Sequence, residues 1–202
     1  AAIAREVARS PITVQPTIQT IRNTASLFDP RVLEDAGWLD AVPPAYLDYL
    51  RGEAQAQRGQ FVAMFGDMIA RGNDAADMGA AQSAFLGRYQ DLLQAMQAEG
   101  AHFLFGSDTA VGGFGWASPP GLAGYWEMHN WVDAGIPLPV LFRAMTIDNA
   151  AAFGLAEEIG TIEPGKRADL LILRGNPLAN VTAYDRIEIV ILAGEAIERC
   201  DL

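Results

Sequence analysis

The stretch Gly100-Ala-His-Phe-Leu-Phe-Gly-Ser-Asp-Thr-Ala-Val-Gly-Gly113 decides the fold class of this chain. A short apolar run, residues 103–105, has the length of a buried strand and stops at a loop of small residues. Gly100 is placed to end the preceding helix. In α/β units, where helix, strand and loop follow in this order, ligands bind beyond the carboxyl ends of the strands. Asp108 is the first ionisable residue past that end, so it is the best candidate for chemistry.

The composition is typical of a globular protein, with 202 residues of which 50% are hydrophobic and 19% are charged. The length fits one domain, with or without a small appendage. Acidic residues outnumber basic ones by 25 to 14, and the formal charge of −11 argues against nucleic acid or an anionic membrane as a partner. No apolar run reaches the length of a membrane span. The single cysteine, Cys200, cannot form an internal disulfide, so stability must come from a core.

The first residues are typical of a helix end followed by a short strand. The chain begins at Ala1 without an initiator Met, so we expect either a processed product or a piece of a longer protein. Residues 12–15 form a β-prone run that ends at Pro16, which cannot donate to a strand ladder. Residues 19–44 contain several turn-forming residues and predict a long irregular excursion, of a kind that often acts as a lid.

Helical periodicity dominates the middle of the chain. Residues 45–72 and 73–99 predict two helices whose aromatic and Met side chains belong to a core rather than to a cofactor site. The glycine-rich segment 111–121 lacks the Gly-Lys-Ser/Thr of a P-loop, so phosphate binding is only weakly indicated. Further helices are predicted over residues 122–134 and 137–145, and a short one ends at Gly154.

From Ile159 onward the pattern changes to short strands and turns. Two apolar runs predict strands, and a turn-forming tripeptide after the second predicts a tight hairpin. These segments are residues 168–173, 187–192 and 193–195. A boundary between a helical and a β region is therefore expected near residues 155–158.

An ordered series of short motifs runs through the last hundred residues. It comprises Gly106-Ser-Asp-Thr-Ala110, Trp131-Val-Asp-Ala-Gly135, Ala144-Met-Thr146, Asn149-Ala150, Phe153-Gly-Leu155, Gly160-Thr-Ile-Glu-Pro-Gly-Lys166, Ala168-Asp-Leu170 and Gly175-Asn-Pro-Leu178. These motifs resemble the C-terminal part of the metal-dependent amidohydrolase superfamily, in particular its imidazolonepropionase and prolidase-like branch. Pro16-Thr17 resembles the end of that family's seventh barrel strand. The resemblance is strong over residues 100–195, partial at 10–18 and absent at 19–99.

The resemblance implies an α/β fold, namely the C-terminal part of a (β/α)₈ TIM-type barrel followed by strands of a small β-sandwich domain. Residues 1–157 would form the partial barrel, with strands seven and eight and a helical insert at about 19–99. Residues 158–202 would supply strands of the sandwich. Two strands cannot close a barrel and leave exposed edges. We therefore expect the missing N-terminal half, or another subunit, as a partner, and a homo-oligomer is left open.

The function that the resemblance implies is a metal-dependent hydrolase acting on an amide, peptide or cyclic amide C–N bond of a small-molecule or peptide-like substrate. Asp108 would be a ligand of a divalent metal, with zinc favoured, and would take the proton from the attacking water. This agrees with physical chemistry, because a metal lowers the pKa of its bound water and a carboxylate can relay the proton. The alternative for Asp108 is a capping or turn residue after the strand.

The remaining ligands that the resemblance implies are a His-x-His pair, a lysine-type bridge and two further histidines, and none is matched here. His102 is expected on the same strand face as Asp108, although a lone histidine in an apolar strand is more often a core residue. His129 is expected outside the site, and Lys166 is expected to be a solvated turn residue. Zinc needs three or four ligands, so the site is incomplete in this chain.

The alternative to an enzyme is a non-catalytic fragment or subunit that docks with an N-terminal half carrying the other metal ligands. The sequence fixes neither the substrate nor the metal. It also leaves the compartment open, with the cytoplasm favoured over a secreted or periplasmic location.

Overall fold

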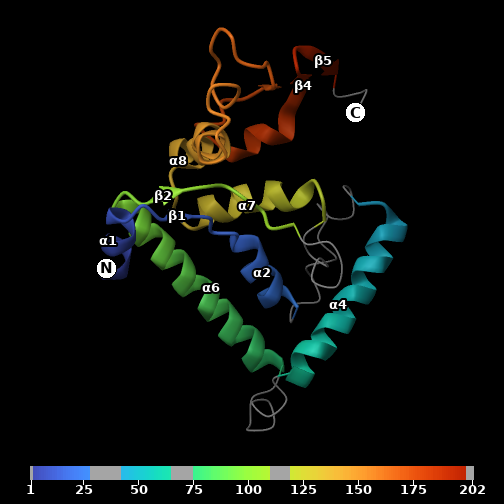
Figure 1. Cartoon of the computed structure of the whole chain (residues 1–202). Coiled ribbons are helices and arrows are strands. Elements are labelled where there is room, and N and C mark those ends of the chain that lie inside the picture. Colours follow the sequence, from blue (N-terminus) through green and yellow to red (C-terminus); the bar gives the residue numbers. More distant parts are fainter. Residues whose placement is uncertain (1, 28–41, 65–74, 110–118, 199–202) are drawn as a thin grey trace. The chain divides into compact units, whose positions relative to one another are not determined.

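The computed structural model describes residues 2–27, 42–64, 75–109 and 119–198, which appear as the coloured ribbon in Figure 1. The chain divides into two compact units. Unit 1 contains residues 1–16, 93–106 and 131–202, and unit 2 contains residues 17–92 and 107–130.

Two short parallel strands lie side by side in unit 1 (Figure 1). Helix α1 (Ala2–Arg9) leads into β1 (Thr13–Val14), and β2 (His102–Phe103) follows helix α6 (Ala75–Ala98). The register pairs Thr13 with His102 and Val14 with Phe103. Gly100, with φ of 84°, takes the left-handed conformation that ends α6, as predicted. The prediction of a helix, a strand and a loop around residue 103 is confirmed.

The predicted irregular excursion after β1 is wrong over its first part. Helix α2 (Ile18–Ser26) begins directly after Pro16-Thr17. Asn23, which looks like a helix breaker in the sequence, is held inside α2 because its Oδ1 accepts a 2.7 Å hydrogen bond from Nε2 of Gln19, one turn earlier. Residues 28–41, the rest of this prediction, lie outside the described residues.

Unit 2 is built from helices. These are α2, α4 (Pro44–Met64), the first part of α6 and the first part of α7 (Leu122–Asp133). Buried Val42, Leu47 and Leu50 form a small core. Partly buried side chains pack against it, namely Leu27, Tyr46, Ala54, Leu122 and Trp126. The predicted helices are thus confirmed within the described residues.

A compact helical segment follows α7 in unit 1. It consists of α8 (Leu138–Arg143), a π-helical turn η2 (Ala144–Asp148) and α9 (Asn149–Ala152). Gly160 approaches this segment so closely that an added Cβ would lie 2.9 Å from the Ile147 Cα and from the Ala150 Cβ. Its φ of 97° also disfavours any side chain, so this position requires glycine.

The C-terminal strands form one antiparallel sheet in the order β3-β4-β5. The strands are β3 (Leu170–Leu173), β4 (Ile187–Leu192) and β5 (Glu195–Glu198), and the 3₁₀ turn η3 (Val181–Arg186) precedes β4. Ala193 and Gly194, with φ of 52° and 89°, form the tight hairpin turn that the sequence predicts. A closed barrel, a sandwich and a domain boundary at residues 157–158 stay predictions.

Asp169 stabilises this hairpin turn, and its contribution to the stability of the protein should depend on pH. Its Oδ1 accepts a 2.8 Å hydrogen bond from the Ala193 N–H, and its Oδ2 accepts from Arg167. These two contacts lower the pKa of the Asp169 carboxyl. A carboxyl whose pKa is lowered by folding stabilises the protein above its unfolded pKa of about 3.9, and loses that effect as the pH falls through the folded pKa.

We therefore expect the Asp169→Asn variant to melt at a lower temperature than the wild type at pH 7. The difference should shrink as the pH falls from about 5 through the folded pKa. Circular dichroism melts between pH 3 and 7 would check this, with Asp91→Asn, an exposed aspartate of α6, as the control. A difference that stays constant over this range would contradict the prediction.

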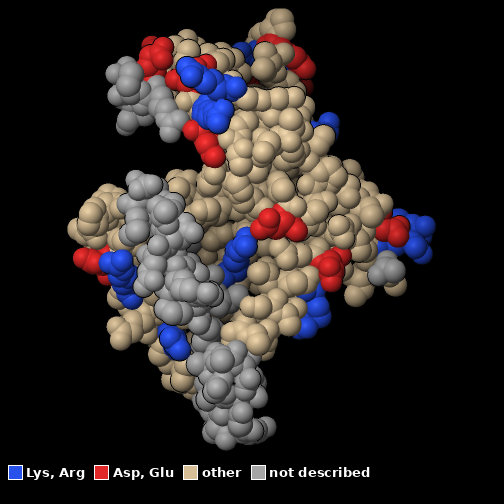
Figure 2. All heavy atoms as spheres, turned by 180° about the vertical axis from the view of Figure 1, so that it is seen from behind, with Lys and Arg blue, Asp and Glu red and all other residues tan. Residues whose placement is uncertain are grey.

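The charged side chains of the described residues are mixed in sign. In Figure 2, basic and acidic groups lie beside one another on the face shown. Several are exposed ion pairs, such as Arg5 with Glu99 at 3.1 Å. None of the helices in the described part of the chain combines the length and apolar character that a bilayer span requires.

Candidate functional site

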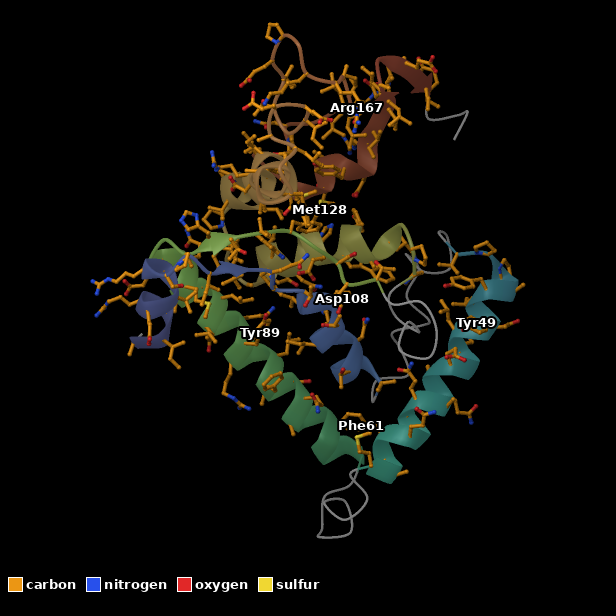
Figure 3. All side chains as sticks on the ribbon, viewed as in Figure 1. Tyr49, Phe61, Tyr89, Asp108, Met128 and Arg167 are labelled. Atoms are coloured by element: carbon orange, nitrogen blue, oxygen red, sulfur yellow. The ribbon has the colours of Figure 1, made fainter. Side chains whose placement is uncertain are left out.

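Asp108 lies in the irregular segment 104–109 that follows β2, and it is labelled in Figure 3. Its side chain is exposed, and its backbone takes a left-handed φ of 46°. The neighbouring hydroxyl groups of Ser107 and Thr109 share a 2.8 Å hydrogen bond and are partly buried. The structure therefore presents a carboxylate to solvent in a polar setting just past the strand end, where the sequence predicts it.

In the described residues, neither histidine forms part of a three-residue metal-ligating group with Asp108. His102 is exposed, so the expectation that it is a core residue is wrong; β2 is short, and only Phe103 of this strand is buried. The alternation that would align His102 with Asp108 does not continue that far, since the strand ends at Phe103 and Asp108 has positive φ. His129 lies on α7, with its ring centroid 4.6 Å from that of Tyr125.

Lys166 is not the solvated charge that its turn position predicts. Its side chain is only 12% exposed, and its Nζ donates to the Thr161 hydroxyl and lies 3.5 Å from Glu163 Oε2. The turn folds back on itself, and the ammonium group of Lys166 links two of its residues, Thr161 and Glu163. Cys200 and most of the glycine-rich loop lie outside the described residues.

A metal site is not completed by the described residues. Over residues 2–27, 42–64, 75–109 and 119–198, no three His, Cys, Asp or Glu side chains come together in a way that could hold a metal ion. A single carboxylate from Asp108 does not meet the three or four ligands that zinc requires. The described residues therefore do not by themselves complete a site for the metal that the family resemblance implies.

The structure reveals a buried polar cluster that the sequence analysis missed. Glu127 on α7 is fully buried, and its two carboxylate oxygens accept the backbone N–H groups of Ile18 and Gln19 at 2.9 and 2.7 Å. These N–H groups belong to the first turn of α2, which has no partners of its own for them. Glu127 thus caps the helix that starts immediately after β1, and its negative charge suits the helix N-terminus.

Amide side chains extend the cluster around Glu127. Asn130 Nδ2 donates a 2.7 Å bond to Gln19 Oε1, and the Arg22 guanidinium donates to Asn130 Oδ1. Gln19 and Asn130 are buried, so the hydrogen bonds satisfy groups that water does not reach. Burial, and then the Glu127 charge, raise the pKa of the Tyr89 hydroxyl. A signal for Glu127 exists in the sequence, because it stands four residues from Ala123 and from Trp131 on the apolar face of α7.

We expect Glu127→Gln to lower the free energy of unfolding by about 2–3 kcal/mol, because the new NH₂ group would face a backbone N–H and leave it without an acceptor. Urea titration followed by circular dichroism would measure the change. The matched control is Glu157→Gln, which makes the same substitution at an exposed position. Equal effects of the two substitutions would contradict a capping role for Glu127.

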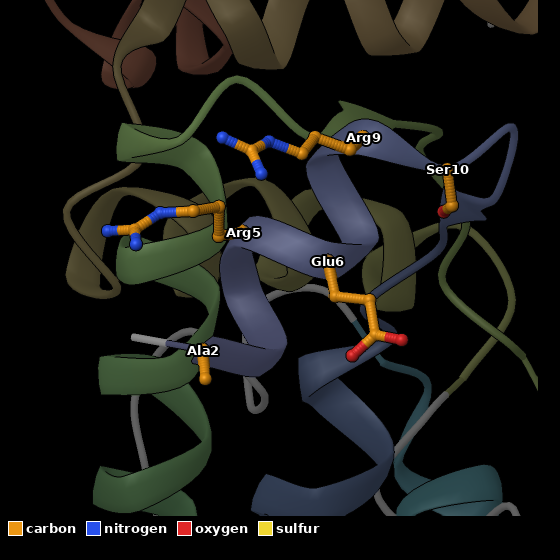
Figure 4. Close-up of a pocket in the computed structure, with 5 residues that line it drawn as sticks. All are labelled: Ala2, Arg5, Glu6, Arg9 and Ser10. Atoms are coloured by element: carbon orange, nitrogen blue, oxygen red, sulfur yellow. The ribbon is translucent and has the colours of Figure 1, made fainter.

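A shallow hollow of about 470 Å³ lies on α1 and is shown in Figure 4. Arg5 and Arg9 point to one side of the helix, and Glu6 points away from them. The Arg5 guanidinium is paired with Glu99, and the Ser10 hydroxyl donates to the Val7 carbonyl at 2.7 Å. The lining residues come from one helix and its end, and two of them, Arg5 and Ser10, are already engaged by Glu99 and Val7, so we do not assign a reaction to this hollow.

Comparison with known protein families shows which family this chain belongs to. The family model described as "Amidohydrolase family" matches residues 22–197. The chain belongs to the amidohydrolase family. The resemblance that the motifs indicate, to the imidazolonepropionase and prolidase-like branch, is thereby confirmed. Its expected extent is wrong in one respect, because the match begins at residue 22 and so includes most of residues 19–99, where the sequence analysis expects no resemblance.

Curated amidohydrolase relatives match over short segments. An imidazolonepropionase from Porphyromonas gingivalis is 48% identical over 40 residues, which is 20% of this chain and 10% of the relative. An adenine deaminase from a Jannaschia species is 36% identical over 70 residues, which is 34% of this chain and 12% of the relative. The matched part is thus a small share of each relative's length.

Solved structures support an α/β amidohydrolase fold. A protein from Bifidobacterium longum that is provisionally assigned as a prolidase is 29% identical, with a TM-score of 0.51 over 61% of this chain and 29% of that one. A Xaa-Pro dipeptidase with bound methionine has the same coverage, with 22% identity and a TM-score of 0.50. This chain thus aligns with less than a third of either structure.

Proposed function

We propose that this chain is the C-terminal portion of a metal-dependent hydrolase that cleaves the C–N bond of an amide, peptide or cyclic amide, with Asp108 in its active site. The observation that carries the proposal is the exposed carboxylate of Asp108 on the loop after β2, the strand paired in parallel with β1, in a member of the amidohydrolase family. Amidohydrolases generally bind divalent metals. The other metal ligands would come from residues outside the described part of the chain, and zinc is the metal we favour.

Asp108 would serve as the proton acceptor in this reaction. Hydrolysis of a C–N bond requires water to lose a proton as it attacks the carbonyl carbon or its equivalent, and the leaving nitrogen must gain one. A positioned carboxylate can take the first proton and deliver it to the nitrogen. The exposure of Asp108 leaves its carboxylate open to substrate and water.

The relatives suggest which substrates to test. Their names indicate Xaa-Pro dipeptides, cyclic amides such as imidazolonepropionate, and the exocyclic C–N bond of adenine. We expect the whole protein, expressed from the complete reading frame, to hydrolyse at least one of these classes and to lose activity on treatment with a chelator. The 202-residue chain by itself should be inactive, because its described residues do not complete a metal site.

The competing proposal is a non-catalytic subunit, favoured by the same lack of a three-ligand group within the described residues. Metal analysis and the substrate panel separate the two on one preparation. A whole protein that binds no metal and hydrolyses none of the substrates would favour the non-catalytic subunit and contradict the enzyme.

A further inference from the structure

One side chain holds the backbone at the end of β2. The N–H of Phe105 donates to Asn149 Oδ1 at 3.2 Å, and Asn149 Nδ2 donates to the Phe105 carbonyl at 2.9 Å. Asn149 is the first residue of α9, 44 positions along the chain, and both groups are partly buried. A single amide thus satisfies both polar groups of one peptide residue, in the way that a neighbouring strand would.

The direction of these bonds explains why a side chain is needed there. The Leu104 N–H donates to the Val14 carbonyl at 2.9 Å, so it points toward β1. Because successive residues of an extended strand turn their polar groups to opposite sides, those of Phe105 point away from β1. Within the described residues this sheet has two strands, so no third strand is available to pair with Phe105.

The side chain of Phe105 is held as firmly as its backbone. The rings of Phe103 and Phe105 each lie 5.7 Å from the ring of Trp131, which is fully buried. Phe105 is therefore fixed on two sides, by Trp131 and by Asn149. The next residue, Gly106, carries no side chain, and the Gln15 amide lies where its Cβ would be. Asp108 follows two residues later.

We propose that Asn149 is a positioning residue for Asp108, an inference that rests on the proposed hydrolase function. Its amide fixes the position and orientation of the Phe105 peptide. Because Asp108 lies three residues further along the chain, the position of its carboxylate depends on how this peptide is held. Three residues span at most about 10 Å, so a rotation of roughly 6° at Phe105 is enough to move Asp108 by about 1 Å. A misplacement of about 1 Å can cost roughly 10²-fold in rate.

Asparagine is suited to this role because it offers a donor and an acceptor together. In the Asn149→Ala variant both bonds are lost. In the Asn149→Asp variant the ionised carboxylate keeps the bond from the Phe105 N–H but faces the Phe105 carbonyl without a proton to donate. When that carboxyl is protonated, it regains one donor beside its acceptor and can restore both bonds.

The matched control is Asn180. Its Oδ1 also accepts a backbone hydrogen bond, from the Thr182 N–H at 2.9 Å, and it caps η3 in the same unit. Substituting Asn180 by Ala or Asp removes or alters a similar bond in a place with no connection to Phe105.

The experiment uses the whole protein and two readouts. Hydrogen exchange of the peptide covering residues 104–109, corrected for intrinsic rates, should accelerate by about 10-fold in Asn149→Ala at pH 7. The acceleration should be smaller in Asn149→Asp, because its carboxylate still accepts from the Phe105 N–H and only the bond to the Phe105 carbonyl is lost. In acid, exchange should return toward the wild-type value in Asn149→Asp alone. The kcat on the substrate found for the wild type should fall by about 10–100-fold, with KM changed little. The Asn180 variants should change neither readout.

Thermal melts show whether each variant folds, and Asn149→Asp gives the result if Asn149→Ala does not fold. Normal kcat in folded Asn149 variants, beside an inactive Asp108→Asn variant, would overturn the positioning role alone. Unchanged exchange at residues 104–109 would overturn the backbone clamp. Absence of hydrolysis in the wild type would overturn the proposed function, and the positioning role would fall with it.

Discussion

Asp108→Asn in the whole protein is expected to lower turnover by about 10²–10⁴-fold while the protein stays folded. The substitution keeps the size and polarity of the side chain, but an amide cannot accept the proton of an attacking water. The measurement is kcat on the substrate identified for the wild type, together with a thermal melt. Substrate binding should change less than kcat, because the proton is transferred in the transition state.

The backbone at Asp108 makes Asn the right replacement. Its φ of 46° lies in the left-handed region, which Asn and Asp tolerate better than other residues with a side chain. Asp108→Ala would therefore combine loss of the carboxylate with backbone strain and would be hard to interpret. Asp91→Asn makes the same charge change at an exposed position of α6 and should leave turnover unchanged. Near-normal turnover in Asp108→Asn would remove Asp108 from the mechanism.

Local signals were enough to predict the elements that flank Asp108. Pro16 marks the end of the first strand region, and Gly100 ends the helix before the second, since each has a backbone restriction that works over a few residues. The same holds for the hairpin turn at Ala193-Gly194. The ends of strands and helices and the hairpin turn depend here on the dihedral angles of these residues themselves, so they can be predicted without a tertiary structure.

Features that depend on specific side-chain partners, whether distant or nearby in the sequence, could not be predicted in this way. Helix α2 looks irregular in the sequence, yet its first N–H groups are capped by Glu127, more than 100 positions away along the chain. Lys166 looks solvated, yet Thr161 and Glu163 surround it when the turn folds. In both cases the deciding contact is a hydrogen bond or charge pair that periodicity does not encode.

At the candidate site, too, the residue could be predicted from the sequence but its supporting contacts could not. The strand end and its family motif indicated Asp108, but neither indicated the support behind it. In the sequence, Asn149 is only one residue of a motif, and its two bonds to Phe105 form when the fold brings the start of α9 to the residues that follow β2. The sequence shows that Asp108 carries a carboxylate that could act as a base, but only the structure shows which residues hold it in place.

Trp131→Ala is expected to lower the free energy of unfolding by about 3–5 kcal/mol, the usual cost of removing a large buried aromatic side chain. Trp131 is 0% exposed, and both Phe103 and Phe105 pack against its ring, at interplanar angles of 68° and 52°. The cavity would lie under β2, so the effect joins lost burial with lost aromatic contacts. Urea titration followed by circular dichroism would measure it.

Two variants of the same helix test this explanation. Trp131→Phe keeps an aromatic ring against both phenylalanines and should cost roughly half as much or less. Val132→Ala removes apolar atoms from the next residue of α7, which is 39% exposed, and should cost less than about 1 kcal/mol. Because Phe105 would lose the ring that holds it, Trp131→Ala should also accelerate hydrogen exchange at residues 104–109 beyond the effect of Val132→Ala. Equal exchange in the two variants would mean that Trp131 stabilises α7 without fixing the strand end that leads to Asp108.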